Sequence, residues 1–399
     1  MLVRCLILLL LLWSVGGISG CGKPPTWNEL VNQVTQPPPP PTTPEATPAE
    51  QPTQPVMPST PAPPPKPDPH VVIAQFKQLK PHEIDDHKLG LLLSLDEGLE
   101  QITELDMKGS SVTDQGLQQI GKLSQLRFLD IRSTQFITAN SFPAIAQATS
   151  LEELRVDPGK ITDESLAVLR PLSELQRFDL RGVKLSYAGY AELLHHKKLI
   201  ELDLRDSNMD DQALDVVTDL PELERLWLGR TRVTDEGVKK LAKLERLHTL
   251  DLTDCRVTGR TFGNMPKGGV EVLVMTNTML NEQGANAIKQ MKNLRVLILT
   301  HLGTMQDVHL MQMVRPLTDL EELNVSNCPL LTSECMRAVL NHKNLRHVEF
   351  GHCPRITDTV FKYLETCKNL KKIIATSTGC SAAGMQYIKS KLPECEVHL

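Results

Sequence analysis

Two short segments carry residues whose types and spacing could do chemistry. Residues 17–23, GISGCGK, match the G-x-x-x-x-G-K pattern of loops that hold phosphates with backbone amides and a lysine. Pro24 stands where such a loop needs Ser or Thr to bind magnesium, so we do not expect nucleotide binding there. His82 and His87 nearly match the H-E-x-x-H zinc pattern, but on a helix they would point about 140° apart. We therefore expect no metal ion shared between them.

The other polar residues suggest no catalytic set. His301 falls in one copy of the repeat described below and His347 and His352 fall in another, and no cluster of acids accompanies them. No Ser/His/Asp or Cys/His arrangement follows from the spacing, and an open curved surface would not activate such groups by excluding water. The sequence predicts neither an enzyme nor a bound cofactor or metal.

The cysteines are better explained by packing than by reactivity. Leaving out Cys5 and Cys21, which lie in the N-terminal leader region, seven of the nine remain, an odd number without the paired short spacing of a zinc site. Cys255, Cys328 and Cys353 each occupy the ninth position of a repeat, where other repeats carry Thr or Ser. We expect buried structural thiols there.

The first twenty residues differ in composition from the rest of the chain. The apolar run at residues 5–12 follows a basic residue and is too short to cross a bilayer, which predicts a secretory signal peptide over residues 1–20. Residues 18–21, ISGC, resemble the lipobox of bacterial lipoproteins. The resemblance implies that Cys21 is acylated and becomes the mature N-terminus, and Gly22 in place of Asp favours the outer membrane. Two or three acyl chains would anchor the protein stably.

Composition also divides the segment that follows. Residues 21–36 are expected to form a tether, and residues 37–69 contain sixteen prolines. Polyproline II extends roughly 3.1 Å per residue, so this segment would reach on the order of 100 Å as a disordered stalk. A docking peptide for a proline-binding domain is the alternative. Residues 70–100 suit an N-terminal cap, and residues 101–399 form the predicted repeat domain.

One pattern recurs twelve times after the cap: an apolar residue, two variable residues, an apolar residue, one variable residue and an apolar residue. The copies start at Ile102, Leu126, Leu151, Leu175, Leu199, Leu223, Leu247, Val270, Leu294, Leu320, Leu345 and Leu370. Consecutive starts are 23 to 26 residues apart, which is the spacing of leucine-rich repeats. Such a unit cannot bury its own apolar face, so its copies stack into a curved solenoid.

Each repeat predicts one strand and one helix. Positions four and six of the pattern point into the solenoid because strand side chains alternate, and positions three, five and seven face its concave side. The second half, for example VTDEGVKKL from Val233, has a threonine N-cap, acids in the first turn and apolar residues at helical spacing. We therefore expect an α/β leucine-rich-repeat solenoid, or horseshoe, of about twelve repeats, with a parallel concave sheet and convex helices.

Stretches such as VTDQGL from Val112 and CPRIT from Cys353 carry a family resemblance. They resemble the cysteine-containing subtype of leucine-rich repeat in F-box substrate adaptors and the threonine-bearing variants of bacterial envelope proteins. The resemblance runs from about residue 100 to the end and implies the fold, but this scaffold serves many unrelated partners. An F-box adaptor would need a helical F-box before the repeats. Residues 71–100 suit a cap better, and a secreted lipoprotein would not meet the ubiquitin machinery.

The N-terminal half of the predicted concave face is a column of acids beside a column of bases. Position five holds Asp106, Asp130, Asp179 and Asp203, and position seven holds Arg132, Arg181 and Arg205. Parallel strands stack such residues about 5 Å apart, where like charges repel. A mutually neutralising ladder is one interpretation, and a polar face for partner docking is the other.

The C-terminal half of that face becomes apolar. Trp227, Val272, Val274, Val296 and Ile298 are expected to form a contiguous patch flanked by threonines. Burying side chains of this kind is worth roughly 1.5–3 kcal/mol each, which favours a binding partner. The alternatives are that β-branched residues merely suit strands, or that part of the chain folds over them.

Charge and composition limit the function further. The formal net charge of -5 and the lack of a basic stripe argue against nucleic-acid binding. We expect a lipid-anchored protein of the bacterial cell envelope, on the outer membrane or its periplasmic face, that binds a protein or peptide partner on the concave face of the repeats. An architectural element that self-associates or binds wall material is the alternative.

Overall fold

The computed structural model of the 399-residue chain describes residues 67–266, 269–340 and 342–399. The predicted signal peptide, the tether with Cys21 and nearly all of the predicted stalk lie outside the described residues. The chain divides between Val71 and Val72 into two units, and the predicted repeats all belong to the second, Val72–Leu399.

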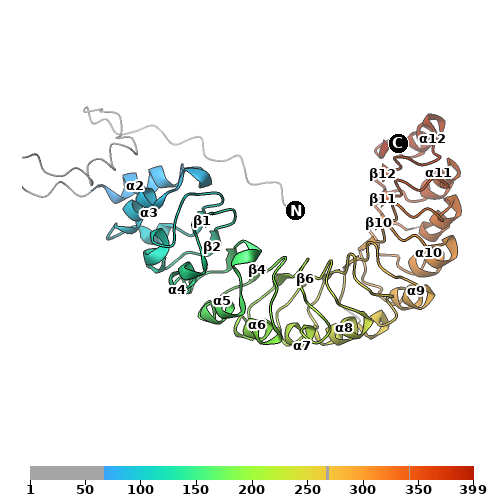
Figure 1. Ribbon diagram of the computed structural model, residues 1–399. Coiled ribbons are helices and arrows are strands. Elements are labelled where there is room, and N and C mark those ends of the chain that lie inside the picture. Colours follow the sequence, from blue (N-terminus) through green and yellow to red (C-terminus); the bar gives the residue numbers. More distant parts are fainter. Residues whose placement is uncertain (1–66, 267–268, 341) are drawn as a thin grey trace, which may run out of the picture. The chain divides into compact units, whose positions relative to one another are not determined.

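The repeats build one parallel sheet whose strands follow the order of the sequence. The strands are β1 (Glu104–Asp106), β2 (Phe128–Asp130), β3 (Glu153–Arg155), β4 (Arg177–Asp179), β5 (Glu201–Asp203), β6 (Arg225–Trp227), β7 (Thr249–Asp251), β8 (Val272–Val274), β9 (Val296–Ile298), β10 (Glu322–Asn324), β11 (His347–Glu349), β12 (Lys372–Ile374) and β13 (Glu396–His398). Within the second unit, the strands line the inner side of a curved solenoid and the helices cover its outer side (Figure 1). The predicted fold class is confirmed.

Short helices connect the strands. The α-helices are α2 (Pro69–Phe76), α3 (Asp86–Leu93), α4 (Phe142–Ile145), α5 (Asp163–Val168), α6 (Tyr187–Ala191), α7 (Leu214–Val217), α8 (Asp235–Lys240), α9 (Glu282–Ile288), α10 (Asp307–Val314), α11 (Thr359–Leu364) and α12 (Ala382–Lys391). The 3-10 helices are η1 (Pro81–Glu83), η2 (Leu99–Gln101), η3 (Gly116–Lys122), η4 (Ala139–Ser141), η5 (Pro158–Lys160), η6 (Glu192–His195), η7 (Leu241–Lys243), η8 (Phe262–Asn264) and η9 (Ser333–Val339). Among the described residues, none of these helices is both long and apolar enough to span a membrane.

The core lies between the sheet and the helices because side chains alternate along each strand. In repeat six, Leu226 at position four and Leu228 at position six are fully buried, whereas Arg225 and Trp227 are half-buried on the concave side. The strand register stacks Leu226 directly between the equivalent leucines of the neighbouring repeats. The concave face is therefore built from positions three, five and seven, as the sequence predicts.

The threonine that begins a convex helix also joins it to the repeat before it. Thr234 caps α8 by accepting a hydrogen bond from the Glu236 N–H, at 3.2 Å. Its own N–H and hydroxyl donate to Asp211 of the preceding repeat, at 2.8 and 2.6 Å. The same link joins Thr113 to Asp86, Thr138 to Asp114, Thr258 to Asp235, Thr332 to Asp307 and Ser381 to Asp358. The acid of each Thr-Asp pair therefore binds the next repeat.

A glycine in these helices leaves room for that acid. A Cβ atom on Gly237, in α8, would overlap the Asp211 carboxylate and lie 3.1 Å from its Cγ. The same overlap would occur for Gly116 with Asp86, Gly189 with Asp163 and Gly384 with Asp358. The Thr/Ser-x-x-Gly sequence is thus a packing motif in which the threonine or serine donates to an aspartate of the preceding repeat and the glycine provides space for that aspartate.

The turn after each strand requires a left-handed backbone at position eight. Positive φ angles occur there at Gly109, Ser133, Gly182, Asp206, Arg230, Asp254, Asn277, His301, Asn327, His352 and Ser377. Repeat three differs because Pro158 occupies this position, and its ring fixes φ near −65°. The chain forms η5 there instead.

Both ends of the repeat array contain more structure than the predicted pattern. Strand β13 pairs with β12, with Val397 opposite Ile373, so the sheet has one strand more than the twelve predicted. At the other end, the predicted cap contains α3, which packs against η3. Its N-cap Asp85 and the following Asp86, which binds Thr113, repeat the pattern of the later helices. Helix α3 therefore takes the place of the helical half of an additional repeat.

Candidate functional site

Four of the predicted partner-binding residues form one block on the concave face. Val272 and Val274 lie on β8, directly opposite Val296 and Ile298 on β9. All four are half-buried, because their neighbours in the sheet cover part of each side chain. We call these four residues the aliphatic block.

Trp227 lies apart from that block. It stands on β6 opposite Asp203 on one side and Asp251 on the other, and Asp251 is in turn opposite Val274. Asp251 is only 8% exposed, and its Oδ1 accepts hydrogen bonds from the Thr253 N–H and hydroxyl, at 2.8 and 2.6 Å. The expected patch is thus interrupted at β7 by a buried carboxylate that is already bonded.

Strands β7 to β9 nevertheless form a nearly uncharged part of the concave face. Its positions three, five and seven, which we call the central window, are Thr249, Asp251, Thr253, Val272, Val274, Thr276, Val296, Ile298 and Thr300. The hydroxyls of Thr276 and Thr300 lie 2.9 Å apart and form a hydrogen bond. With Asp251 buried, the window offers a partner methyl groups and hydroxyls and little charge.

The predicted Asp/Arg columns form a ladder in which Asp130, Asp179 and Asp203 each have a basic partner nearby. Arg132 contacts Asp130 at 2.5 Å, Arg181 contacts Asp179 at 2.7 Å, and Arg205 contacts Asp203 at 2.6 Å. Arg181 also reaches Asp203, at 3.5 Å, so the ladder crosses from one repeat to the next. Asp106, at the N-terminal end, is exposed and accepts only the Lys108 N–H among the contacts of the described residues.

The pKa shifts of the ladder residues follow from this pairing. The hydrogen bonds that Arg132, Arg181 and Arg205 donate to their partner carboxylates raise the pKa values of these arginines. Burial alone would raise the pKa of Asp179, but the Arg181 guanidinium outweighs it and lowers that pKa. The charges of Asp130, Asp179 and Asp203 are satisfied within the fold, which supports the neutralising ladder over a free polar docking face.

The cysteine column is buried, as predicted. Cys255, Cys328 and Cys353 donate to carbonyl oxygens of Leu228, Leu299 and Val325, at 3.1, 3.2 and 3.3 Å. Burial raises the pKa of all three thiols, that of Cys328 to about 12. Because the thiolate is the reactive form, these cysteines are inert at neutral pH. No disulfide joins the seven cysteines of the described residues.

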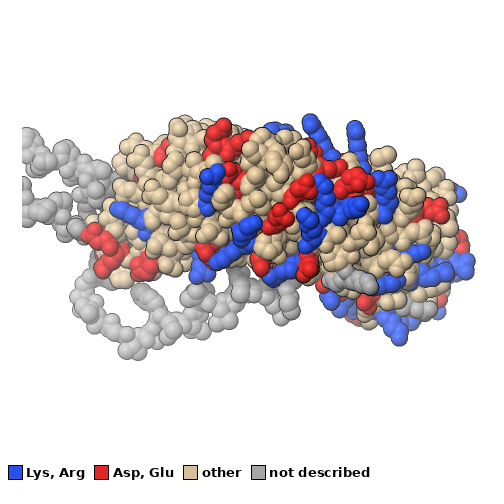
Figure 2. Space-filling model, turned by 90° about the horizontal axis from the view of Figure 1, so that it is seen from below, with Lys and Arg blue, Asp and Glu red and all other residues tan. Residues whose placement is uncertain are grey.

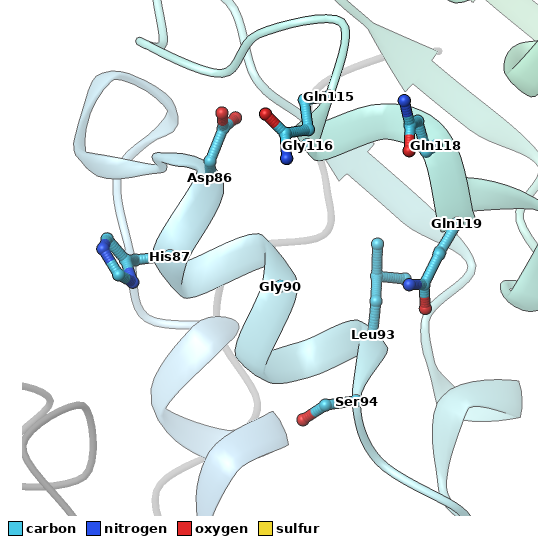
Figure 3. A pocket seen from close by; sticks show the side chains of 9 residues that line it. All are labelled: Asp86, His87, Gly90, Leu93, Ser94, Gln115, Gly116, Gln118 and Gln119. Atoms are coloured by element: carbon cyan, nitrogen blue, oxygen red, sulfur yellow. The ribbon is translucent and has the colours of Figure 1, made fainter. Parts of the chain in front are cut away.

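Two pockets offer little chemistry. One, of ≈420 Å³, lies between α3 and η3 and is lined by Asp86, His87 and several glutamines (Figure 3). The Asp86 carboxylate is already bonded to Thr113, so the pocket presents mainly amide groups. The other, of ≈280 Å³, lies beside the irregular turn at Pro158 and includes Arg132 and Arg181, both paired with aspartates.

The histidines singled out in the sequence are not brought together. His82 lies in η1 and His87 in α3, so the zinc-like segment is not a single helix. No group of three or more potential ligands that could hold a metal occurs in the described ranges. His301 and His352 are exposed turn residues at position eight, and His347 lies on β11.

The outer face in Figure 2 is not divided into a charged part and an aliphatic part as the concave face is. Figure 2 shows Lys and Arg side chains interspersed with Asp and Glu over the central helices. Ion pairs such as Lys240 with Asp215, at 2.9 Å, cross between neighbouring repeats there. The change from paired charge to an aliphatic surface is a property of the concave face.

No protein-family model and no curated protein sequence matches the chain. Solved structures do resemble it. An internalin from Listeria monocytogenes gives a TM-score of 0.50 at 16% identity, covering 83% of this chain and 93% of that chain. A leucine-rich-repeat protein from Leptospira interrogans gives 0.42 at 18% identity (78% and 92% covered), and a yeast Rad7 and Elc1 complex gives 0.47 at 17% (82% and 86%). The likeness to the internalin concerns the fold. Together with the parallel sheet of stacked repeats, it establishes a leucine-rich-repeat solenoid.

Proposed function

We propose that this protein is a non-enzymatic recognition module that binds a protein or peptide partner at the central window. The observation that carries the proposal is the aliphatic block, which lies in a weakly charged window beside a ladder of paired charges. Curved repeat surfaces of this kind suit extended contacts with other macromolecules.

The size of the block limits what it can contribute. Fully burying a Val or Ile side chain stabilises by roughly 1.5–3 kcal/mol, and about a third or less of each of these four residues is still exposed, so covering them is worth at most about 2–4 kcal/mol. A micromolar complex requires about 8 kcal/mol, and association has entropic costs of its own. The block would therefore be the centre of a larger interface that includes the threonines and Trp227.

The same proposal places the protein in a bacterial envelope, held by lipid on Cys21, with the proline-rich segment as a spacer. Its support is the lipobox-like sequence ISGC after an apolar run, together with the sixteen prolines of residues 37–69. A stalk of this kind would hold the recognition surface away from the membrane.

Affinity capture with the full-length chain tests the binding proposal. We expect a saturable heterologous partner whose binding is lost in Ile298→Asp, because a carboxylate would then be desolvated in the aliphatic block. Glu104→Ala is the matched control, since Glu104 is an exposed concave residue on β1, far along the sheet from the block. Capture of only the chain itself would favour an architectural, self-associating role. Equal binding by both variants would contradict the proposal.

A further inference from the structure

Two glutamates lie beside the aliphatic block on its C-terminal side. Glu322 on β10 is directly opposite Val296, and Asn324 on the same strand is opposite Ile298. On the next strand, β11, His347 is opposite Glu322, and Glu349 is opposite Asn324. The glutamates therefore continue the concave surface from the edge of the block.

These two acids differ from those of the ladder in their partners. His347 Nδ1 lies 3.7 Å from Glu322, and its Nε2 lies 2.8 Å from Glu349. The Asn324 amide also donates to Glu349, at 2.7 Å. In the parts of the chain that the structure describes, no Lys or Arg forms an ion pair with either glutamate. One imidazole, which is cationic only when protonated, thus faces two carboxylates.

A glutamate in the N-terminal half of the concave face has arginine partners instead. Glu153, at position three of repeat three, contacts both Arg155 and Arg177, each at 2.5 Å. The side chains of Glu322 and Glu349 keep exposed fractions of 31% and 21%. They combine negative charge, access from solvent and a position next to an apolar surface.

We infer that the partner presents an apolar segment followed by a basic side chain, and that this side chain binds Glu322 and Glu349 while the apolar residues cover the block. The inference rests on the proposed function and specifies the chemistry of its partner. A lysine or arginine would form charge-assisted hydrogen bonds with carboxylates that lack a permanent cation. An acidic residue at this place would be repelled, so the pair would also select against acidic segments.

The sheet geometry sets the spacing of such a segment. Neighbouring strands are about 4.8 Å apart, so Ile298 on β9 and Glu349 on β11 are separated by roughly 10 Å across the sheet. An extended peptide advances about 3.3 Å per residue, so the basic residue should follow the last apolar contact by about three residues. Arginine would suit the site best because its planar guanidinium can contact two carboxylates at once.

A displayed library of random peptides, selected on the immobilised full-length chain, provides the probe. We expect the selected peptides to share an apolar stretch with Lys or Arg about three residues away. Binding of a selected peptide should weaken at least tenfold in the double variant Glu322→Gln/Glu349→Gln, and its dependence on salt should become shallower. Glu321→Gln is the matched control, because Glu321 already contacts Arg295 and Arg346, at 3.5 and 4.0 Å.

The outcomes separate the inference from the proposed function. Peptides that need the aliphatic block, as shown by loss of binding in Ile298→Asp, but that lack a basic residue would overturn the inference alone. Selected peptides that bind the double glutamine variant as tightly as the parent chain would do the same. Failure to enrich any block-dependent peptide would count against both the inference and the function on which it rests.

Discussion

The link between repeats predicts an unusual effect of Gly237→Ala. In an exposed helix this change normally stabilises by about 0.5–1 kcal/mol, because glycine has the higher entropy when unfolded. Here the new methyl group would overlap the Asp211 carboxylate and lie 3.2 Å from Leu214 Cδ2. To relieve the overlap, Asp211 must leave Thr234, to which it is bonded at 2.8 and 2.6 Å.

The expected magnitude follows from these two bonds. Hydrogen bonds to a charged group contribute about 1.5–3 kcal/mol each, and the lower end applies because the pair is only partly buried. Losing both costs about 3 kcal/mol, against which the helix gains up to about 1 kcal/mol. We expect a net loss of about 2 kcal/mol. Gly90→Ala is the control, since Gly90 is an exposed glycine within α3 and no atom of the described residues lies within 4 Å of the added carbon.

Both chemical denaturation and hydrogen exchange are needed to measure the effect, because repeat arrays need not unfold in one step. Gly237→Ala should lower the unfolding midpoint and increase exchange in both flanking repeats, whereas Gly90→Ala should leave the midpoint unchanged or raise it. In an Asp211→Ala background, Gly237→Ala should become neutral or stabilising. An equal cost in both backgrounds would refute the role assigned to the carboxylate.

Four further predictions concern the core, pH, the anchor and the window. Leu226→Ala should cost about 2–5 kcal/mol and loosen the adjoining repeats, which hydrogen exchange would show; exchange confined to the mutated turn would contradict this. Burial lowers the pKa values of His196 and His342, and in each ring one nitrogen bonds a carbonyl while the other has no hydrogen-bond partner among the described residues. The unfolded chain therefore takes up these protons first, so stability should be full above about pH 6.5 and fall as the pH drops below it; His196→Gln should reduce this slope in denaturation measured from pH 7.5 to 5. Intact mass should show a mature chain that begins at acylated Cys21, with Cys21→Ser released or stalled as precursor, and another N-terminus would refute the anchor. Trp227→Ala should weaken partner binding by at least 2 kcal/mol, about thirtyfold in Kd, without altering the circular dichroism spectrum; unchanged affinity would remove Trp227 from the interface.

The period of the apolar residues predicts the solenoid and its inner and outer faces because each repeat can bury its apolar positions in only one way. The same period does not predict β13, the last strand of the sheet. Glu394 occupies the first apolar position of that repeat, and the next residue, Cys395, is buried instead. The strand forms although the first position of its repeat is charged, because the buried residue next to that position packs into the core in its place.

The sequence indicates the helix caps but not the links between repeats. Thr234 and Asp211 are 23 residues apart, and only the stacking of two repeats brings them together. The segment HEIDDH illustrates the same limit. Its histidines suggest metal chemistry, whereas Asp85 and Asp86 are the helix start of an incomplete repeat that binds Thr113. Comparing it with the Thr-Asp motifs of later repeats would have indicated this role.

For the concave face, the residue columns are predictable but their neighbours and exposure are not. Trp227 is separated from the aliphatic block by Asp251, a consequence of strand order that is visible only when adjacent columns are compared. Asp130, a predicted member of the polar face, is only 2% exposed, so it is held in the ladder and is not accessible to a partner. The importance of Glu322 and Glu349 depends on the lack of an ion pair with Lys or Arg among the described residues, for which Ser326 and Gly351 at position seven are the available sequence signal.

Site-specific photo-crosslinking in the cells that make this protein would test directly whether a partner binds the central window. A photoreactive amino acid would replace Val274 in the central window or, as a control, Glu236, whose side chain is 63% exposed on convex helix α8. We expect crosslinks to a different protein from position 274 and none to that protein from position 236. Crosslinks only from position 236, or only to copies of the chain itself, would contradict it.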